Sequence, residues 1–136
     1  METPWMDIAK EEIGVHEIES GDSSRIVEYH SVTSLHAMDD DTPWCAAFVC
    51  WVLHEAGYDH THSAWAKNYL KYGDKCDPKY GAIMIFSRGH ESGHVGFYVG
   101  EDYGTYHILG GNQKNSVCIA NMPKTKFLGA RWPIKV

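Results

Sequence analysis

The chain places a cysteine, Cys45, directly behind the polar stretch DDDTPW and directly in front of the apolar run AAFVCWVLHEAG. Thr42 and Pro43 form a typical helix start, with the threonine as N-cap and the proline at the first helical position, so Cys45 is predicted at the third. The unpaired N–H groups and partial positive charge of a helix N-terminus stabilise a thiolate and lower the pKa of a cysteine there. Cys45 is therefore a candidate nucleophile, although a free cysteine is most often a small buried hydrophobe.

A nucleophile of this kind needs a base, and His94 is the histidine best placed to be one. It follows Gly93 in the segment SGHVGFYVG and opens a run in which Val95, Phe97 and Val99 alternate as in a strand. A histidine at the start of such a strand is exposed at one end and anchored at the other, as a general base must be. The other histidines of the chain lack this setting.

The third member of such a site accepts the second ring N–H of the histidine and so orients it. Asn112, in the segment LGGNQ, is the first candidate, because antiparallel pairing puts the end of the 106–109 strand beside the start of the His94 strand. An asparagine after two glycines is also typical of a turn. His107 and Gln113 remain alternatives for this role.

The remaining cysteines, Cys50, Cys76 and Cys118, are interpreted as structural, since their spacing is irregular and no CxxC pair occurs. A disulfide framework is not expected in a reducing compartment. The segment HESGH, residues 90–94, matches the HExxH zinc signature, which works only on a helix. Glycines interrupt this segment and a β-prone run follows it, so a zinc endopeptidase of this type is not favoured.

The secondary-structure pattern changes between the two halves of the chain. Helical patterns fill about 1–75: a helix from Trp5 to Gly14, a short one from Ser24, one through the apolar run to Gly57, and one over about 63–72. Short β-prone runs fill about 79–134, namely GAIMIFS, HVGFYVG, TYHILG, SVCIA and FLGARW. This order predicts an α+β fold with N-terminal helices packed on a C-terminal antiparallel sheet.

The bulk composition excludes several classes of protein. The 136 residues indicate a single domain, 1–136, with one core. A net charge of −6 without a basic cluster argues against nucleic-acid binding. The chain lacks an apolar run of about 18 residues, which argues against stable membrane association. Its N-terminus, METPWMDIAKEE, lacks the basic and apolar regions of a secretion signal, so we expect synthesis in the cytoplasm without a signal peptide.

Four segments in order, TPWCAAFV, YGAIMIF, GHVGFYVGE and LGGNQ, resemble the papain-like cysteine peptidases and amidases of the CHAP and NlpC type. The resemblance covers nearly the whole chain and is nearest to the short single-domain members found in phage lysis modules and bacterial toxin cassettes. It implies a papain-like fold, in which the helix that carries the nucleophile packs on an antiparallel sheet. It also implies hydrolysis of an amide bond of peptidoglycan, either within the peptide stem or between N-acetylmuramic acid and L-alanine.

The resemblance also implies roles for single residues. Cys45 matches the nucleophile of the family, His94 its histidine, and Asn112 the polar third residue of the CHAP pattern. NlpC-type members instead carry a histidine earlier on that strand, near His107. Many CHAP domains have a glutamate two residues before the asparagine, where this chain has Gly110, so a four-residue catalytic set is not supported.

Such an enzyme requires no cofactor. Many CHAP domains bind calcium in an acidic loop before the cysteine, and Asp39–Asp41 are acidic here. The usual downstream glycine and ligand spacing are absent, so calcium is the less favoured interpretation. Trp44, Trp65 and Tyr98, together with Tyr103, are candidates to line a substrate groove, since aromatic faces suit sugars and peptide stems.

The function we expect from these features is that of a monomeric phage endolysin, which acts on the bacterial cell wall after holin-type delivery. One alternative is a toxin-type wall hydrolase injected by a secretion machine. Others are a zinc-dependent amidase, using Cys45, His94 and another histidine, and a non-catalytic wall-binding module. The presence of Cys45, His94 and Asn112 together argues against the last.

Overall fold

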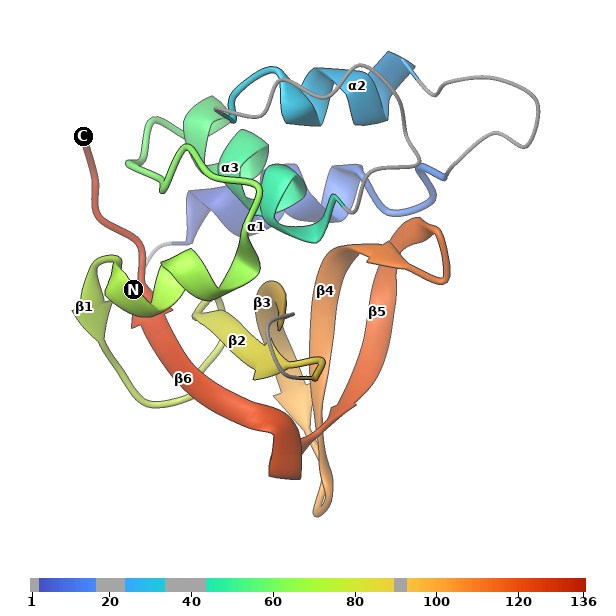
Figure 1. The fold of residues 1–136 in the computed structure, drawn as a ribbon, viewed down its shortest axis with the longest axis vertical. Helices are drawn as coiled ribbons and strands as arrows, with labels where there is room; N and C mark the ends of the chain where they lie inside the picture. Colours follow the sequence, from blue (N-terminus) through green and yellow to red (C-terminus); the bar gives the residue numbers. More distant parts are fainter. Residues whose placement is uncertain (1–2, 17–23, 34–43, 90–92) are drawn as a thin grey trace.

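The structure, a computed structural model, describes residues 3–16, 24–33, 44–89 and 93–136. The helices gather at one end of a curved sheet (Figure 1), which confirms the predicted α+β class. The elements in chain order are α1 (Pro4–Glu11), α2 (Ser24–His30), α3 (Cys45–Glu55), the 3-10 helix η1 (Ala66–Lys71), β1 (Asp74–Lys75), β2 (Ile83–Ser87), β3 (Gly93–Glu101), β4 (Thr105–Gln113), β5 (Ser116–Pro123), the 3-10 helix η2 (Lys124–Lys126) and β6 (Phe127–Trp132).

The strands form one six-stranded sheet in the order β1-β6-β2-β3-β4-β5, and each neighbouring pair is antiparallel. Each of the five β-prone runs of the sequence forms a strand, although Gly81 and Ala82 of the first run precede β2. The exception to the predicted pattern is β1, a two-residue edge strand with no such run, which pairs with the end of β6. The helix predicted over about 63–72 is present as the 3-10 helix η1.

Helix α3 lies at the centre of the core, and each of its residues from Cys45 to Leu53 is buried. The sequence predicts a one-sided apolar stripe, but α1 and α2 pack on this helix as well as β3 and β4, so it is apolar on all sides. Phe48 shows this enclosure, because its ring centroid lies 5.3 Å from that of Tyr29 in α2 and 6.5 Å from that of Phe97 in β3. Among the described helices, none is long and apolar enough to span a bilayer.

Polar contacts hold the outer helices against α3. Tyr29 of α2 donates a hydrogen bond of 2.7 Å to Glu12, just after α1, and Trp51 of α3 donates one of 3.0 Å to Glu28 of α2. Arg25 pairs with both carboxylates, at 3.2 Å from Glu12 and 2.9 Å from Glu28. These contacts satisfy the carboxylates beside an apolar core and set the direction in which α3 presents its N-terminus to the sheet.

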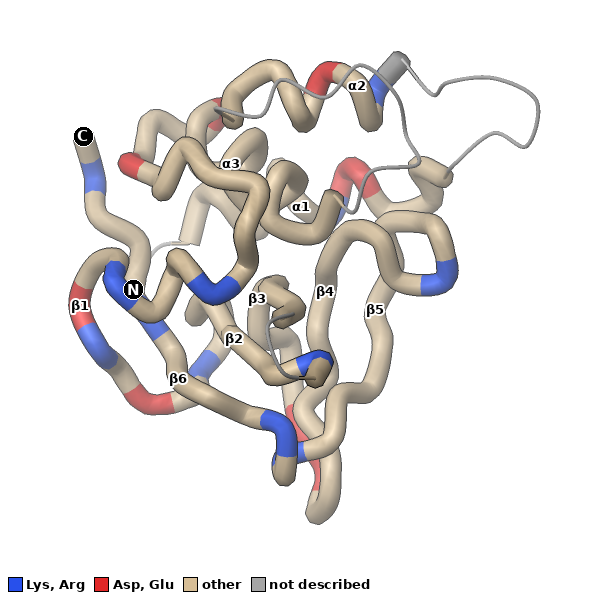
Figure 2. The backbone as a smooth tube through the Cα atoms, viewed as in Figure 1, with Lys and Arg blue, Asp and Glu red and all other residues tan. Residues whose placement is uncertain are grey.

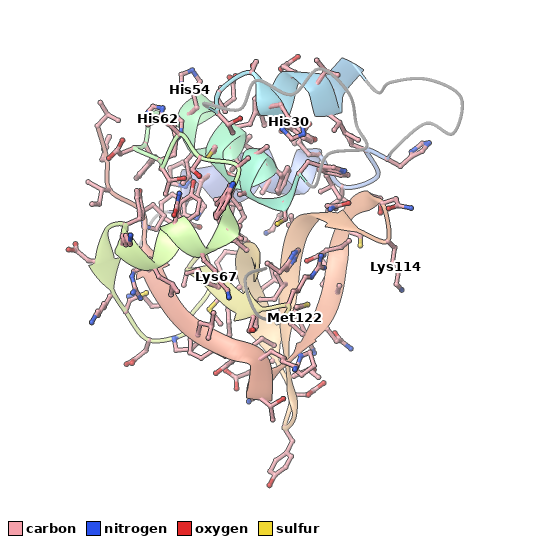
Figure 3. The ribbon with its side chains drawn as sticks, in the orientation of Figure 1. His30, His54, His62, Lys67, Lys114 and Met122 are labelled. Atoms are coloured by element: carbon pink, nitrogen blue, oxygen red, sulfur yellow. The ribbon has the colours of Figure 1, made fainter. Side chains whose placement is uncertain are left out.

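The sheet curls so that its second face, here called the inner face, also carries an apolar core. The side chain of Ala82, just before β2, is buried there with side chains of β2, β4 and β6: Met84, Phe86, Ile108 and Ala130. Partly buried residues complete this cluster, among them Tyr98, Tyr106, Phe127 and Met122, the last labelled in Figure 3. His94 pairs with Phe86 across β2 and β3, and residues paired in this way share a face, so His94 belongs to the inner face.

A β-bulge interrupts β4 just before its end. Gly110 pairs with Cys118 and Gln113 pairs with Ser116, so β4 holds one residue more than β5 between these two pairs. Asn112 lies in this interval with a positive φ of 55°, a conformation that asparagine tolerates better than most residues. Lys114 and Asn115 then close the hairpin, both also with positive φ.

Gly111 lets β4 approach the start of α3. A Cβ built at Gly111 would lie 2.7 Å from ring atoms of Trp44 and 2.8 Å from Cβ of Phe48. Both of these side chains are fully buried, so they have little room to withdraw. The absence of a side chain at Gly111 therefore sets the distance between the sheet and the helix N-terminus.

We expect the substitution Gly111→Ala to destabilise the fold by about 1–3 kcal/mol, because the added methyl group overpacks a rigid contact. Urea unfolding followed by circular dichroism measures this change. Gly104→Ala is the matched control, since a Cβ at Gly104 meets nothing within 4 Å. Equal stabilities of the two variants would show that the Gly111 contact is not tight.

Candidate active site

Cys45 is the first residue of α3, two positions nearer the helix start than its predicted third position. Trp44 is the N-cap residue, with non-helical φ and ψ of −129° and 17°, and its carbonyl accepts the first helical hydrogen bond from Phe48 N–H at 2.9 Å. Thr42 and Pro43, from which the predicted position was counted, lie outside the described residues. At this first position the Cys45 N–H has no partner within the helix.

The Cys45 side chain is nearly enclosed, with 5% of the residue exposed. Burial raises the pKa of the Cys45 thiol, because a thiolate loses its hydration there. Smaller effects lower this pKa: the backbone N–H of Val95, the charge of Arg88, and the N–H groups of Ala46 and of Cys45 itself. Desolvation thus has a larger effect on the pKa of Cys45 than the helix N-terminus has, and Cys45 rests as a neutral thiol.

His94 is the second residue of β3 and is fully buried. It lies beside the N-terminus of α3, because the N–H of the next residue, Val95, contacts the Cys45 sulfur. Burial, followed by the charge of Arg88, lowers the pKa of His94 to about 4, while its hydrogen bond to Gln113 acts in the opposite direction. The imidazole is therefore neutral at pH values where the thiol is also neutral.

Gln113 determines which nitrogen of His94 carries the proton. Its Nε2 donates to two backbone carbonyls, that of Ile108 at 3.1 Å and that of Cys118 at 2.6 Å. Its Oε1 therefore faces His94 Nε2, at 2.7 Å, and can only accept. His94 must be protonated on Nε2, so Nδ1 holds the lone pair. Nδ1 is buried and has no hydrogen-bond partner among the described residues, which leaves it ready to accept a proton.

Asn112 does not make this contact, although it was the first candidate for it. Without a bulge, Asn112 would share the inner face with Gly110, two residues before it. Because of the extra residue in β4, the side chain of Gln113, and not that of Asn112, shares the inner face with Gly110. The geometry agrees, because a Cβ at Gly110 would lie 2.8 Å from Gln113 Oε1 and 3.5 Å from His94 Nε2. The amide of Gln113 thus fills the space that the glycine leaves.

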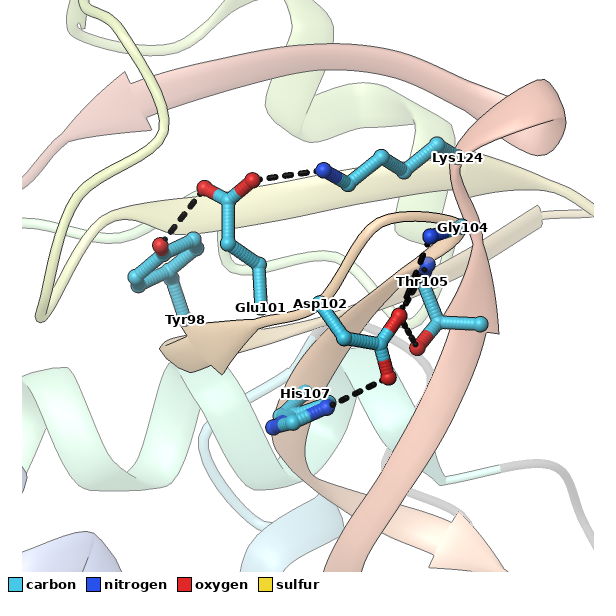
Figure 4. A network of polar contacts seen from close by, with 7 residues as sticks. All are labelled: Tyr98, Glu101, Asp102, Gly104, Thr105, His107 and Lys124. Carbon is cyan, nitrogen blue, oxygen red and sulfur yellow. Dashed lines mark hydrogen bonds and ion pairs between the residues drawn. The ribbon is translucent and has the colours of Figure 1, made fainter.

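His107, the other alternative, lies far from His94 on the same sheet. It pairs with Gly100, six residues along β3 from His94, which corresponds to about 20 Å of strand. Its Nε2 lies 3.2 Å from Asp102, whose carboxylate also accepts hydrogen bonds from Thr105 and the Gly104 N–H (Figure 4). His107 therefore helps to hold the β3–β4 turn and takes no part in the site around Cys45.

The aromatic residues predicted to line a groove divide into two kinds. Trp44 is fully buried, with its ring 5.8 Å from that of Tyr29, so it is part of the core and cannot contact a substrate. Trp65 is 70% exposed, just before η1, and remains available for binding. Tyr98 is partly buried on the inner face and donates a hydrogen bond of 2.7 Å to Glu101, in the network of Figure 4. Tyr103 is fully exposed at the hairpin tip.

The described residues offer no metal centre. Within residues 3–16, 24–33, 44–89 and 93–136, no group of three His, Cys, Asp or Glu side chains is arranged to hold a metal ion. Asp39–Asp41, the calcium candidates, lie outside these residues. His94 is in a strand, which removes the helix that an HExxH zinc site needs.

The second cysteine of α3 lies in a different environment. Cys50 is fully buried, and its sulfur lies 3.1 Å from the hydroxyl of Tyr69 and 3.6 Å from that of Thr61. These contacts join α3 to η1 and to the loop before it. Cys50 is therefore a packing residue on the same helix as Cys45.

Residues 37–112, more than half of the chain, match the CHAP domain family, and the chain belongs to that family. No curated protein matches the chain closely enough to be compared with it. CHAP domains are papain-like amidases and peptidases, so the chain is a cysteine-dependent cell-wall hydrolase whose substrate class is peptidoglycan. The matched region contains Cys45 and His94 and ends one residue before Gln113.

Two residues of the site were missed or ranked too low by the sequence patterns. Gln113 was only an alternative, and the signal for it, a bulge formed around the glycine pair, is not visible in a pattern of apolar residues. Arg88, whose charge acts on both Cys45 and His94, belongs to no motif. Its position directly after β2, the strand that pairs with the start of β3, is the feature that identifies it.

The lowered pKa of His94 makes the fold sensitive to acid. The unfolded chain takes up a proton near the ordinary histidine pKa of 6.5, whereas the folded chain resists it down to about 4. The contribution of His94 to the free energy of unfolding is therefore fully present above the ordinary pKa of 6.5 and is lost as the pH falls toward about 4. When the pH is lowered from about 7 to about 4.5, we expect the free energy of unfolding to fall by roughly 2 kcal/mol less in His94→Gln than in the wild type. Urea unfolding at the two pH values measures this difference. Equal losses would contradict the buried, neutral state.

The role of Gln113 in positioning His94 is tested by Gln113→Ala. We expect kcat to fall on the order of tenfold or more with little change in KM, because the substitution leaves the imidazole without an acceptor. The acid limb of the pH profile should also move, which a purely structural loss would not cause. Asn112→Gly is the control, because glycine accepts the positive φ, and it should retain most activity. The reverse result would return the orienting role to Asn112.

Proposed function

We propose that the chain hydrolyses an amide bond of peptidoglycan with Cys45 as nucleophile, His94 as general acid and base, and Gln113 as the residue that positions His94. The observation that carries this proposal is the state of His94. Its Nε2–H is held by Gln113, its buried Nδ1 has no hydrogen-bond partner among the described residues, and the N–H of the next residue, Val95, contacts the Cys45 sulfur. A buried base with a fixed tautomer beside a thiol fits nucleophilic catalysis better than it fits a wall-binding surface.

The first half of the proposed reaction forms an acyl-enzyme. The Cys45 sulfur attacks the carbonyl carbon as its proton passes to His94 Nδ1, so that a neutral pair becomes a thiolate-derived adduct and an imidazolium. The imidazolium then gives this proton to the leaving nitrogen, the C–N bond breaks, and an amine departs. A thioester joins the remaining acyl group to Cys45. Throughout these steps the Nε2–H of His94 stays hydrogen-bonded to Gln113 Oε1.

Water completes the cycle in the second half. His94 Nδ1 takes a proton from the water as its oxygen attacks the thioester carbon. The C–S bond breaks, the proton returns to the sulfur, and a carboxylic acid leaves. The backbone N–H of Cys45, at the first position of α3, is the donor proposed for the oxyanion in both halves, an interaction typically worth about 3–4 kcal/mol.

Two finer assignments belong to this proposal. The first is a substrate contact by Trp65, whose exposed ring can stack on a sugar or a peptide stem. The second is the role of a phage endolysin, delivered to the wall by a holin or, for an effector, by injection. The resemblance to short single-domain members of the superfamily supports this second assignment. Mass spectrometry of digested sacculi identifies which amide is cut, and lysis with and without outer-membrane permeabilisation tests the need for delivery.

Cys45→Ser should abolish the release of soluble fragments from purified sacculi while leaving the fold intact, because a serine hydroxyl is far harder to deprotonate than a thiol. Cys50→Ser is the matched control on the same helix and should retain most activity. Similar losses in the two variants would contradict the assignment of Cys45 as the nucleophile.

Reagents separate thiol from metal catalysis in the wild type. We expect iodoacetamide to inactivate the enzyme, with modification mapped to Cys45, and EDTA or phenanthroline to leave it active. The opposite pattern would make Cys45 and His94 zinc ligands. Loss in EGTA with recovery in calcium would favour the calcium interpretation of Asp39–Asp41 over the cofactor-free one.

A further inference from the structure

We propose that Arg88 binds a carboxylate of the substrate next to the amide bond that is cut, and so selects peptide stems whose neighbouring carboxyl group is free. This inference rests on the proposed function and names a feature of its substrate. Arg88 is the first residue after β2, and none of the sequence motifs includes it.

The strand register brings Arg88 to the site. Phe86 pairs with His94 and Ser87 pairs with Gly93, so β2 ends beside the start of β3. Arg88 directly follows Ser87, the last residue of β2, and its charge acts on both Cys45 and His94. In Figure 2 the chain is blue where β2 ends.

Arg88 differs from the other two arginines in its contacts. Arg25 pairs with Glu12 and Glu28, and Arg131 donates to the carbonyls of Leu70 and Ala130. The Arg88 side chain is exposed and makes no hydrogen bond or ion pair with the described residues. A guanidinium presents five N–H donors in a planar fork that matches a carboxylate, so these donors are available to a ligand.

The charge of Arg88 has opposite consequences for the two reacting groups. It favours the thiolate of Cys45 and disfavours the imidazolium of His94. Because both charges form together when the proton moves, these two effects oppose each other, and Arg88 is not an efficient activator by itself. A bound carboxylate would neutralise the guanidinium and remove the repulsion from the imidazolium. The substrate anion would then assist the reaction as well as binding.

Peptidoglycan offers the ligand that this arrangement requires. Its peptide stems carry free carboxyl groups beside their amide bonds, and a primary carboxamide at the same position has a similar shape without the charge. A carboxylate accepts two parallel hydrogen bonds from a guanidinium, whereas a carboxamide accepts only through its oxygen. Discrimination between the two therefore depends on Arg88.

The first experiment compares native sacculi with the same sacculi after their carboxyl groups are converted to carboxamides with carbodiimide and ammonia. We expect the wild type to digest the native form roughly tenfold faster. Arg88→Gln should lose that advantage and digest both forms at similar rates, and Arg88→Lys should keep part of it. Lys75→Gln, which removes one charge from the exposed edge strand β1, should behave as the wild type. An unchanged preference in Arg88→Gln would overturn the proposal.

A second experiment does not depend on peptidoglycan. Iodoacetate is an anion and iodoacetamide is neutral, so the ratio of their rates at Cys45, measured by peptide mapping, reports a cation beside the thiol. We expect this ratio to fall roughly threefold in Arg88→Gln and to stay constant in Lys75→Gln. A constant ratio in both variants would also overturn the proposal. If the wild type left native sacculi intact, the proposed hydrolase function would fail, while the alkylation ratio would still decide whether an anion site adjoins Cys45.

Discussion

The hydrogen bond between His94 Nε2–H and Gln113 Oε1 is the interaction on which the site depends. It exists because two backbone carbonyls, those of Ile108 and Cys118, hold the amide of Gln113 in one orientation. That orientation fixes the tautomer of His94 and leaves Nδ1 as the only ring atom able to accept a proton. A side chain at Gly110 would enter the space of this contact, so the departure from the glutamate of many CHAP domains has a structural reason.

The site also combines two neutral groups that are both shielded from water. Enclosure of α3 on all sides stabilises the fold, and the same enclosure raises the pKa of Cys45 and lowers that of His94. The charges needed for attack are thus unfavourable at rest and form only as the proton is transferred. Polar contacts from a substrate would favour these charges, and Arg88, which has no ion-pair partner among the described residues, is the cation whose charge acts on both groups.

The fold class and the positions of most elements could be predicted from periodicity and from helix and turn signals, because these depend on neighbours in sequence. Cys45 and His94 could be singled out as candidates for the same reason, since each lies near the start of a predicted element. The contact of Gln113 could not, because it depends on one extra residue in β4, and a bulge leaves little trace in the pattern of apolar residues. Trp44 was misassigned because burial of an aromatic residue depends on Tyr29 and Gly111, which are distant in the chain.

Because of the bulge in β4, residues that share a column of a sequence alignment need not occupy the same position in the fold. The resemblance of the LGGNQ segment to the CHAP pattern sets Asn112 at the polar third residue, while the side chain that contacts His94 belongs to the next residue, Gln113. A chain from which Asn112 was deleted would regain regular pairing, and its glutamine would still face the inner side of the sheet. Homologues with and without this insertion can therefore share one site while their alignments disagree about which residue completes it.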